Sequence, residues 1–62
     1  PDLSAEESSI VQLLEQHPEG LHINILATET LIPISRLSSL LFELELRGIV
    51  RPSAGSNYRL IH

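Results

Sequence analysis

The most restrictive feature of the sequence is a stripe of aliphatic side chains in residues 34–47. These side chains recur at intervals of three and four residues, at Ile34, Leu37, Leu40, Leu41 and Leu44. This spacing places them on one face of an α-helix. Gly48 follows at the position where helices commonly stop. The pattern therefore predicts a helix over about residues 34–47 whose apolar face fills the core.

Two further helices are expected upstream. Ser4 and Glu7 have the spacing of a capping box, in which each side chain accepts a hydrogen bond from the other residue's backbone. A helix should therefore run over about residues 5–17, until residues 18–20 stop it. Its buried side would carry Ile10, Leu13, Leu14 and, at the margin, Val11. A shorter helix is expected over about residues 24–30, with Asn24 as its N-cap, Leu26 and Ala27 packing inward, and Pro33 limiting it from the far side.

Short alternations of apolar and polar residues indicate a small sheet. Residues 21–23 could form a brief edge strand, and residues 49–52 and 57–61 flank a turn-forming segment at 53–56 that contains a glycine. In this hairpin Val50, Tyr58 and Leu60 should point inward, because side chains alternate along a strand. Arg51 and Arg59 should then point outward.

The expected element order is α-β-α-α-β-β. Three helices, a short strand and a terminal hairpin describe a mainly α fold with a small β-hairpin, the winged helix-turn-helix, whose wing is the hairpin. A plain three-helix bundle would leave the alternation in the last segment unexplained.

The chain is short and contains no cysteine, with 62 residues of which 42% are hydrophobic. We expect one domain over residues 1–62, without room for a closed substrate cavity. The opening Pro1-Asp2 without a methionine suggests a piece of a longer chain, with residues 1–4 as a linker from a preceding domain. The three histidines are scattered, and no catalytic motif has usable spacing, so we expect no enzyme, metal or cofactor site. The absence of cysteine and of a long apolar run favours a cytoplasmic, non-membrane protein.

Charge is divided unevenly along the chain, whose net charge is −4. Of the eight acidic residues, all but Glu43 and Glu45 lie in residues 1–30, whereas all four basic residues are arginines in residues 31–62. Affinity for duplex DNA depends on cations placed against phosphates. We therefore expect at most weak DNA binding, confined to the second half of the chain.

The outer face of the 34–47 helix is a candidate binding surface. At about 100° per residue, it carries Ser35, Ser39, Phe42 and Leu46. A helix that reads the major groove would carry arginine, lysine, asparagine or glutamine there. Phe42 and Leu46 fit three interpretations: ordinary surface residues, an extension of the core, or a docking patch for another protein. We favour docking, because a domain of a larger protein has a neighbour to dock against.

Three arginines are candidate DNA contacts. Arg51 and Arg59 lie on the expected wing, and Arg36 lies on the flank of the 34–47 helix. The alternative for the wing pair is that it only keeps an exposed hairpin soluble. Arg47 should instead interact favourably with the C-terminus of its own helix.

The chain contains the segments GLHINILA at residues 20–27, LLFELELRGIV at residues 40–50 and GSNY at residues 55–58. These segments resemble the C-terminal winged-helix domain of the bacterial DNA-processing protein DprA, also known as Smf. The most specific part is residues 44–50, in which the leucine between Glu45 and Arg47 is typical of DprA. Two positions differ from the family pattern: Leu31 stands where a glycine is common, and Pro33 where a serine is common.

The resemblance implies a role for the whole protein. Proteins of this family bind incoming single-stranded DNA and help to load the recombinase RecA onto it in natural transformation, mainly through a preceding Rossmann-like domain. We therefore expect an accessory module that contacts that domain, a second copy of itself or a RecA-type recombinase. One alternative is a sequence-specific transcriptional regulator, which would need a cationic recognition helix. Another is a pure protein-interaction module.

Overall fold

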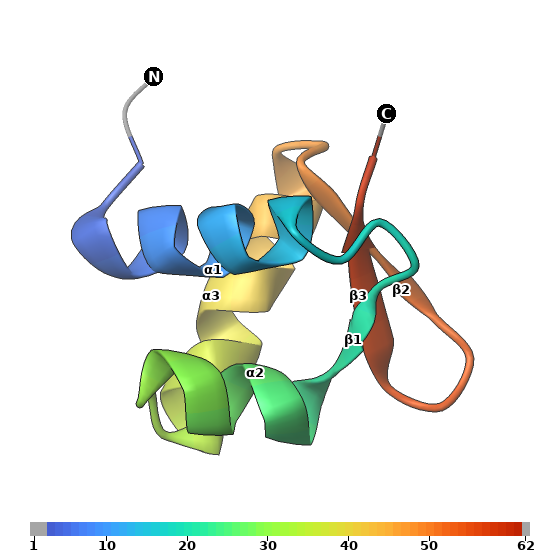
Figure 1. Ribbon diagram of the computed structural model, residues 1–62. Coiled ribbons are helices and arrows are strands. Elements are labelled where there is room, and N and C mark those ends of the chain that lie inside the picture. Colours follow the sequence, from blue (N-terminus) through green and yellow to red (C-terminus); the bar gives the residue numbers. More distant parts are fainter. Residues whose placement is uncertain (1–2, 62) are drawn as a thin grey trace.

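Within the residues that the structure describes, the fold has three helices and a small three-stranded sheet (Figure 1). The computed structural model describes residues 3–61. Its elements are α1 (Ala5–Glu15), β1 (Leu21–His22), α2 (Ile23–Thr30), α3 (Ile34–Leu46), β2 (Val50–Ser53) and β3 (Asn57–Leu60). This order confirms the predicted winged helix, mainly α with a small hairpin. Residues 1, 2 and 62 lie outside the described part, so half of the expected 1–4 linker and one histidine fall there.

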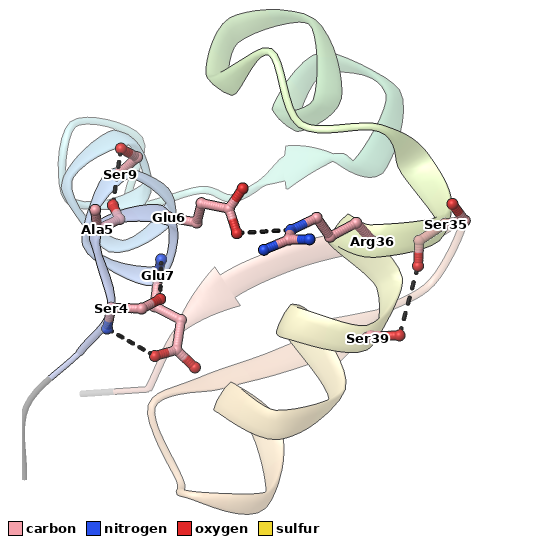
Figure 2. A network of polar contacts seen from close by, with 8 residues as sticks. All are labelled: Ser4, Ala5, Glu6, Glu7, Ser9, Ser35, Arg36 and Ser39. Carbon is pink, nitrogen blue, oxygen red and sulfur yellow. Dashed lines mark hydrogen bonds and ion pairs between the residues drawn. The ribbon is translucent and has the colours of Figure 1, made fainter.

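The start of α1 is fixed by the predicted capping box. The Ser4 hydroxyl accepts from the backbone N–H of Glu7 at 3.1 Å, and the Glu7 carboxylate accepts from the backbone N–H of Ser4 at 2.9 Å (Figure 2). The helix ends at Glu15, two residues before the expected end. The backbone N–H groups of Gln16 and His17 donate to carbonyls only three residues back, which tightens the chain out of the α-helix.

The start of α2 differs from the sequence prediction. The strand stops at His22, and the helix begins at Ile23 rather than after an Asn24 cap. His22 is the N-cap, because its Nδ1 accepts from the backbone N–H of Asn24 at 3.0 Å. The N–H of Ile23, which has no partner within the helix, donates to the carbonyl of Ser56 at 3.0 Å and ties this point of the chain to the wing.

The connection between α2 and α3 turns the chain by 109°, within the range of helix-turn-helix motifs. Leu31 is the C-cap of α2 and has a left-handed backbone, with φ 62°. Pro33 then occupies the N-cap position of α3, where no side chain caps the helix. At the far end α3 stops at Leu46, one residue earlier than expected, and Arg47 is its C-cap.

The core lies between the three helices and the sheet. Its buried side chains are Ile10, Leu14, Leu26, Ile32, Leu37, Leu41, Leu44 and Val50. Leu13, Val11, Ala27 and Leu40 pack against this cluster while half-buried. The prediction that Ile34 belongs to the buried stripe is wrong, since its side chain is 46% exposed. As the first residue of α3 it lies at the rim of the core, and Ile32 in the preceding turn fills the interior instead.

The sheet has the strand order β1-β3-β2, and both pairs are antiparallel. Gly20 before β1 has φ 96°, and a Cβ atom there would lie 2.8 Å from the Tyr58 carbonyl oxygen, so the close approach of the chain to β3 requires glycine. The predicted inward residues Tyr58 and Leu60 pack against the core with Val50. The wing turn was predicted at residues 53–56 but spans residues 54–56, because Ser53 pairs with Asn57 and belongs to β2. It projects away from the helices (Figure 1) and includes Gly55 with φ 75°.

Within residues 3–61, no single helix is long and apolar enough to cross a membrane. In the same range, α2 and α3 are long and apolar enough only when they are counted together, and they are separated by a 109° bend. The buried leucines of α3 belong to the core of this domain.

Candidate functional site

The outer face of α3 carries one continuous row of exposed side chains, which we call the α3 stripe: Ser35, Ser39, Phe42 and Leu46. Phe42 is 59% exposed and Leu46 is 70% exposed, so the prediction that both point away from the core is confirmed. The Ser39 hydroxyl lies 3.5 Å from the Ser35 carbonyl one turn back. The stripe therefore has an apolar C-terminal half and a small, polar N-terminal half.

Acidic side chains flank the apolar half of the stripe. Glu43 and Glu45 are both exposed and, at about 100° per residue, lie on opposite sides of the line through Phe42 and Leu46. Neither glutamate has an ion-pair partner among residues 3–61. The α3 stripe itself carries no cation.

The two arginines of the α3 region face α1. The Nε of Arg36 donates to Oε1 of Glu6 at 2.7 Å, and Figure 2 shows the guanidinium reaching across from α3 to α1. Nη1 of Arg47 lies 3.8 Å from Oε1 of Glu7, a residue that is only 5% exposed. Both positive charges are thus compensated within the domain, and Arg36 points toward α1 and not along the α3 stripe.

The wing carries the other two arginines. Arg51 on β2 and Arg59 on β3 are directly opposite each other in the hairpin register, and both are exposed, as predicted. Together with Pro18, Leu60 and Ile61, the two arginines line a recess. Like charges placed opposite each other on a sheet repel. Neither arginine has an ion-pair partner in the part of the chain that the structure describes.

The histidines within residues 3–61 have local roles. His22 caps α2, and Nδ1 of His17 lies 3.4 Å from Oε2 of Glu19. No group of three or more histidine, aspartate or glutamate side chains in the described residues is arranged to hold a metal ion.

Comparison with known protein families shows to which family the chain belongs. A family model described as the DprA winged helix domain matches residues 1–56, which include all three helices, β1, β2 and the wing turn. The chain belongs to the DprA winged helix domain family. No curated protein and no solved structure matches the chain significantly.

Leu31 and Pro33, the two residues at which the sequence was expected to differ from the DprA pattern, lie in the turn between α2 and α3. Leu31 adopts the left-handed backbone that glycine adopts most readily, and its side chain is 87% exposed. Pro33 leaves α3 without the side-chain cap that a serine would provide.

Sequence analysis missed two features of the DprA winged helix domain. The pairing of Glu6 with Arg36 joins residues 30 positions apart, and no local pattern signals it. The positions of Glu43 and Glu45 could have been predicted from the sequence, because the helical projection that defines the α3 stripe also places these two residues beside it.

Proposed function

We propose that this chain is a non-catalytic accessory module of a DprA-like DNA-processing protein, and that it docks on protein surfaces through the α3 stripe. The observation that supports this most strongly is the make-up of the stripe, with two large apolar side chains, two serines and no cation. A winged helix that reads the major groove presents cationic or amide side chains on this face. An apolar face gains free energy by contact with another apolar surface.

The exposed area of the stripe is sufficient for an anchoring contact. Complete burial of a leucine or phenylalanine side chain contributes about 1.5–3 kcal/mol. Phe42 and Leu46 keep more than half of their area exposed, so covering them would contribute on the order of 1–2 kcal/mol each. Two such residues one helical turn apart form the kind of small central cluster that dominates binding at many interfaces.

A direct role in DNA recognition is secondary in this proposal. Of the candidate DNA contacts, Arg36 is paired with Glu6, which leaves Arg51 and Arg59 on the wing. Two arginines support weak contact with phosphates and no base reading. A sequence-specific regulator would require cations on α3, and the α3 stripe has none. A pure protein-interaction module would differ from our proposal only in making no use of the wing arginines.

The resemblance to DprA extends the proposal to the whole protein. There the module would serve the handling of incoming single-stranded DNA, the loading of a RecA-type recombinase and natural transformation in the bacterial cytoplasm. Its docking partner would be the preceding Rossmann-like domain, a second copy of the module or the recombinase. In each case the partner would meet the same apolar half of the α3 stripe.

Sedimentation velocity tests the docking role in three samples: the domain alone, the domain with the separately expressed preceding domain, and the domain with the recombinase. We expect a complex in one sample that Phe42→Glu abolishes, because the new carboxylate would have to lose its water in the interface. Gln12→Glu is the matched control, since it adds the same charge at an exposed position of α1. Complexes absent from all samples, or unaffected by Phe42→Glu, would contradict the proposal.

A further inference from the structure

The carboxylates beside the α3 stripe carry information about the partner, provided that the stripe docks as proposed above. Glu43 and Glu45 are exposed, lie on either side of Phe42 and Leu46, and have no ion-pair partner among residues 3–61. By contrast, the first two glutamates of α1 pair with Arg36 and Arg47. The apolar contact residues are therefore bordered by two carboxylates that make no direct ion pair among residues 3–61.

We infer that α3 inserts into an apolar groove on another protein whose borders carry lysine or arginine side chains. Phe42 and Leu46 fill the groove, and the two carboxylates pair with the basic residues at its edges. Electrostatic complementarity of this kind contributes mostly to the association rate and to the choice of partner.

The geometry of α3 suits such a groove. The four residues of the stripe are spaced at i, i+4, i+7 and i+11, so they follow one line along the helix over about 16 Å. Amphipathic helices that bind in grooves use anchors with this spacing. Ser35 and Ser39 are small, which allows the walls of the groove to approach the N-terminal half of the helix closely.

The same charges argue against the other classes of partner. A twofold pairing of two α3 helices through Phe42 and Leu46 would bring carboxylates of the two copies near each other, in a chain whose net charge is already −4. Phosphates of nucleic acids and anionic lipid headgroups would meet the same repulsion. A basic protein groove is the surface that compensates both glutamates.

Two synthetic helical peptides test the inference by ¹H–¹⁵N correlation spectroscopy of the labelled domain. Both peptides present one leucine stripe and have equal length, but one has lysine and the other has glutamate beside the stripe. We expect the lysine peptide to shift the resonances of residues 42–46 and to bind about three- to tenfold more tightly than the glutamate peptide. Raising the salt concentration to about 1 M should remove this preference, because it shortens the screening length to about 3 Å.

Matched variants separate a local effect from the general acidity of the chain. Glu43→Gln with Glu45→Gln should abolish the preference for lysine. The control variant, Glu15→Gln with Glu29→Gln, removes the same amount of charge from exposed positions on α1 and α2. It should retain the preference for the lysine peptide. If both variants lose the preference equally, or if the wild-type domain binds the two peptides equally, the inference is wrong.

The failure of the inference can be distinguished from the failure of the docking role. If both peptides bind equally at residues 42–46 and Phe42→Ser abolishes this binding, the α3 stripe is a docking surface, but the inference of a groove with basic borders is wrong. Shifts confined to other faces of the domain with either peptide would overturn both. A concentration-dependent dimer removed by Phe42→Ser would likewise overturn the basic groove, because it would show that a second copy covers the stripe.

Discussion

Replacement of Leu31 by glycine should stabilise the domain. Leu31 caps the C-terminus of α2 with φ 62° and ψ 26°, a left-handed conformation that crowds the Cβ atom of an L-residue. Its side chain is 87% exposed, so its removal uncovers almost no apolar surface. The backbone N–H that donates to the Ala27 carbonyl at 2.9 Å is also present in glycine. The substitution therefore changes mainly the backbone energy.

Two opposing contributions set the magnitude. The left-handed conformation costs a residue with a Cβ atom about 1–2 kcal/mol, which glycine avoids. Glycine also gives the unfolded chain more conformational freedom, which lowers stability by about 0.4–1 kcal/mol. The net increase in the free energy of unfolding should be about 0.5–1 kcal/mol. For a domain of this size, that corresponds to a melting temperature higher by roughly 2–8 °C.

Thermal and urea unfolding, followed by circular dichroism, measure this difference. Leu31→Ala is the control, because alanine keeps the backbone cost while removing the same exposed side chain, so its stability should stay within about 0.5 kcal/mol of wild type. If Leu31→Gly were no more stable than Leu31→Ala, the left-handed backbone would not be the origin of the effect. A loss of stability with glycine would show that the Leu31 side chain makes a stabilising contact.

Four further outcomes follow from the structure. Ser4→Ala removes half of the capping box and should lower the free energy of unfolding by about 1 kcal/mol in urea titrations. Leu41→Ala opens the core and should cost about 2–5 kcal/mol, enough to leave a domain this small largely unfolded in a thermal melt. Phe42→Glu should change the free energy of unfolding by only about 0.5 kcal/mol in the same experiment, and a large loss of stability would mean that this residue belongs to the core. Duplex DNA should bind no more tightly than about 10⁻⁶ M at physiological salt by fluorescence anisotropy. Arg51→Ala and Arg59→Ala should weaken DNA binding further. A tight, sequence-selective complex with the wild-type domain would contradict the prediction of weak binding.

The candidate surfaces were largely visible in the sequence because they lie on regular elements. The helical period placed Phe42 and Leu46 opposite the core, and strand alternation turned Arg51 and Arg59 outward. The environment of Arg36 was not predictable in this way. Its partner Glu6 lies on a different helix, and the two meet only after α1 and α3 pack together.

The sequence by itself determined the type and order of the elements, because those depend on neighbouring residues. The capping box at Ser4, the leucines of α3 and the alternation around Tyr58 each act within a few positions of the chain. Only the tertiary structure decided where the elements end and which side chains complete the core. The N–H of Ile23 at the start of α2 reaches the wing, and Ile32 is buried in place of Ile34 because the turn between two packed helices directs it inward. Such contacts join residues far apart in the chain, so the free energy that fixes them exists only once the helices and the sheet have come together.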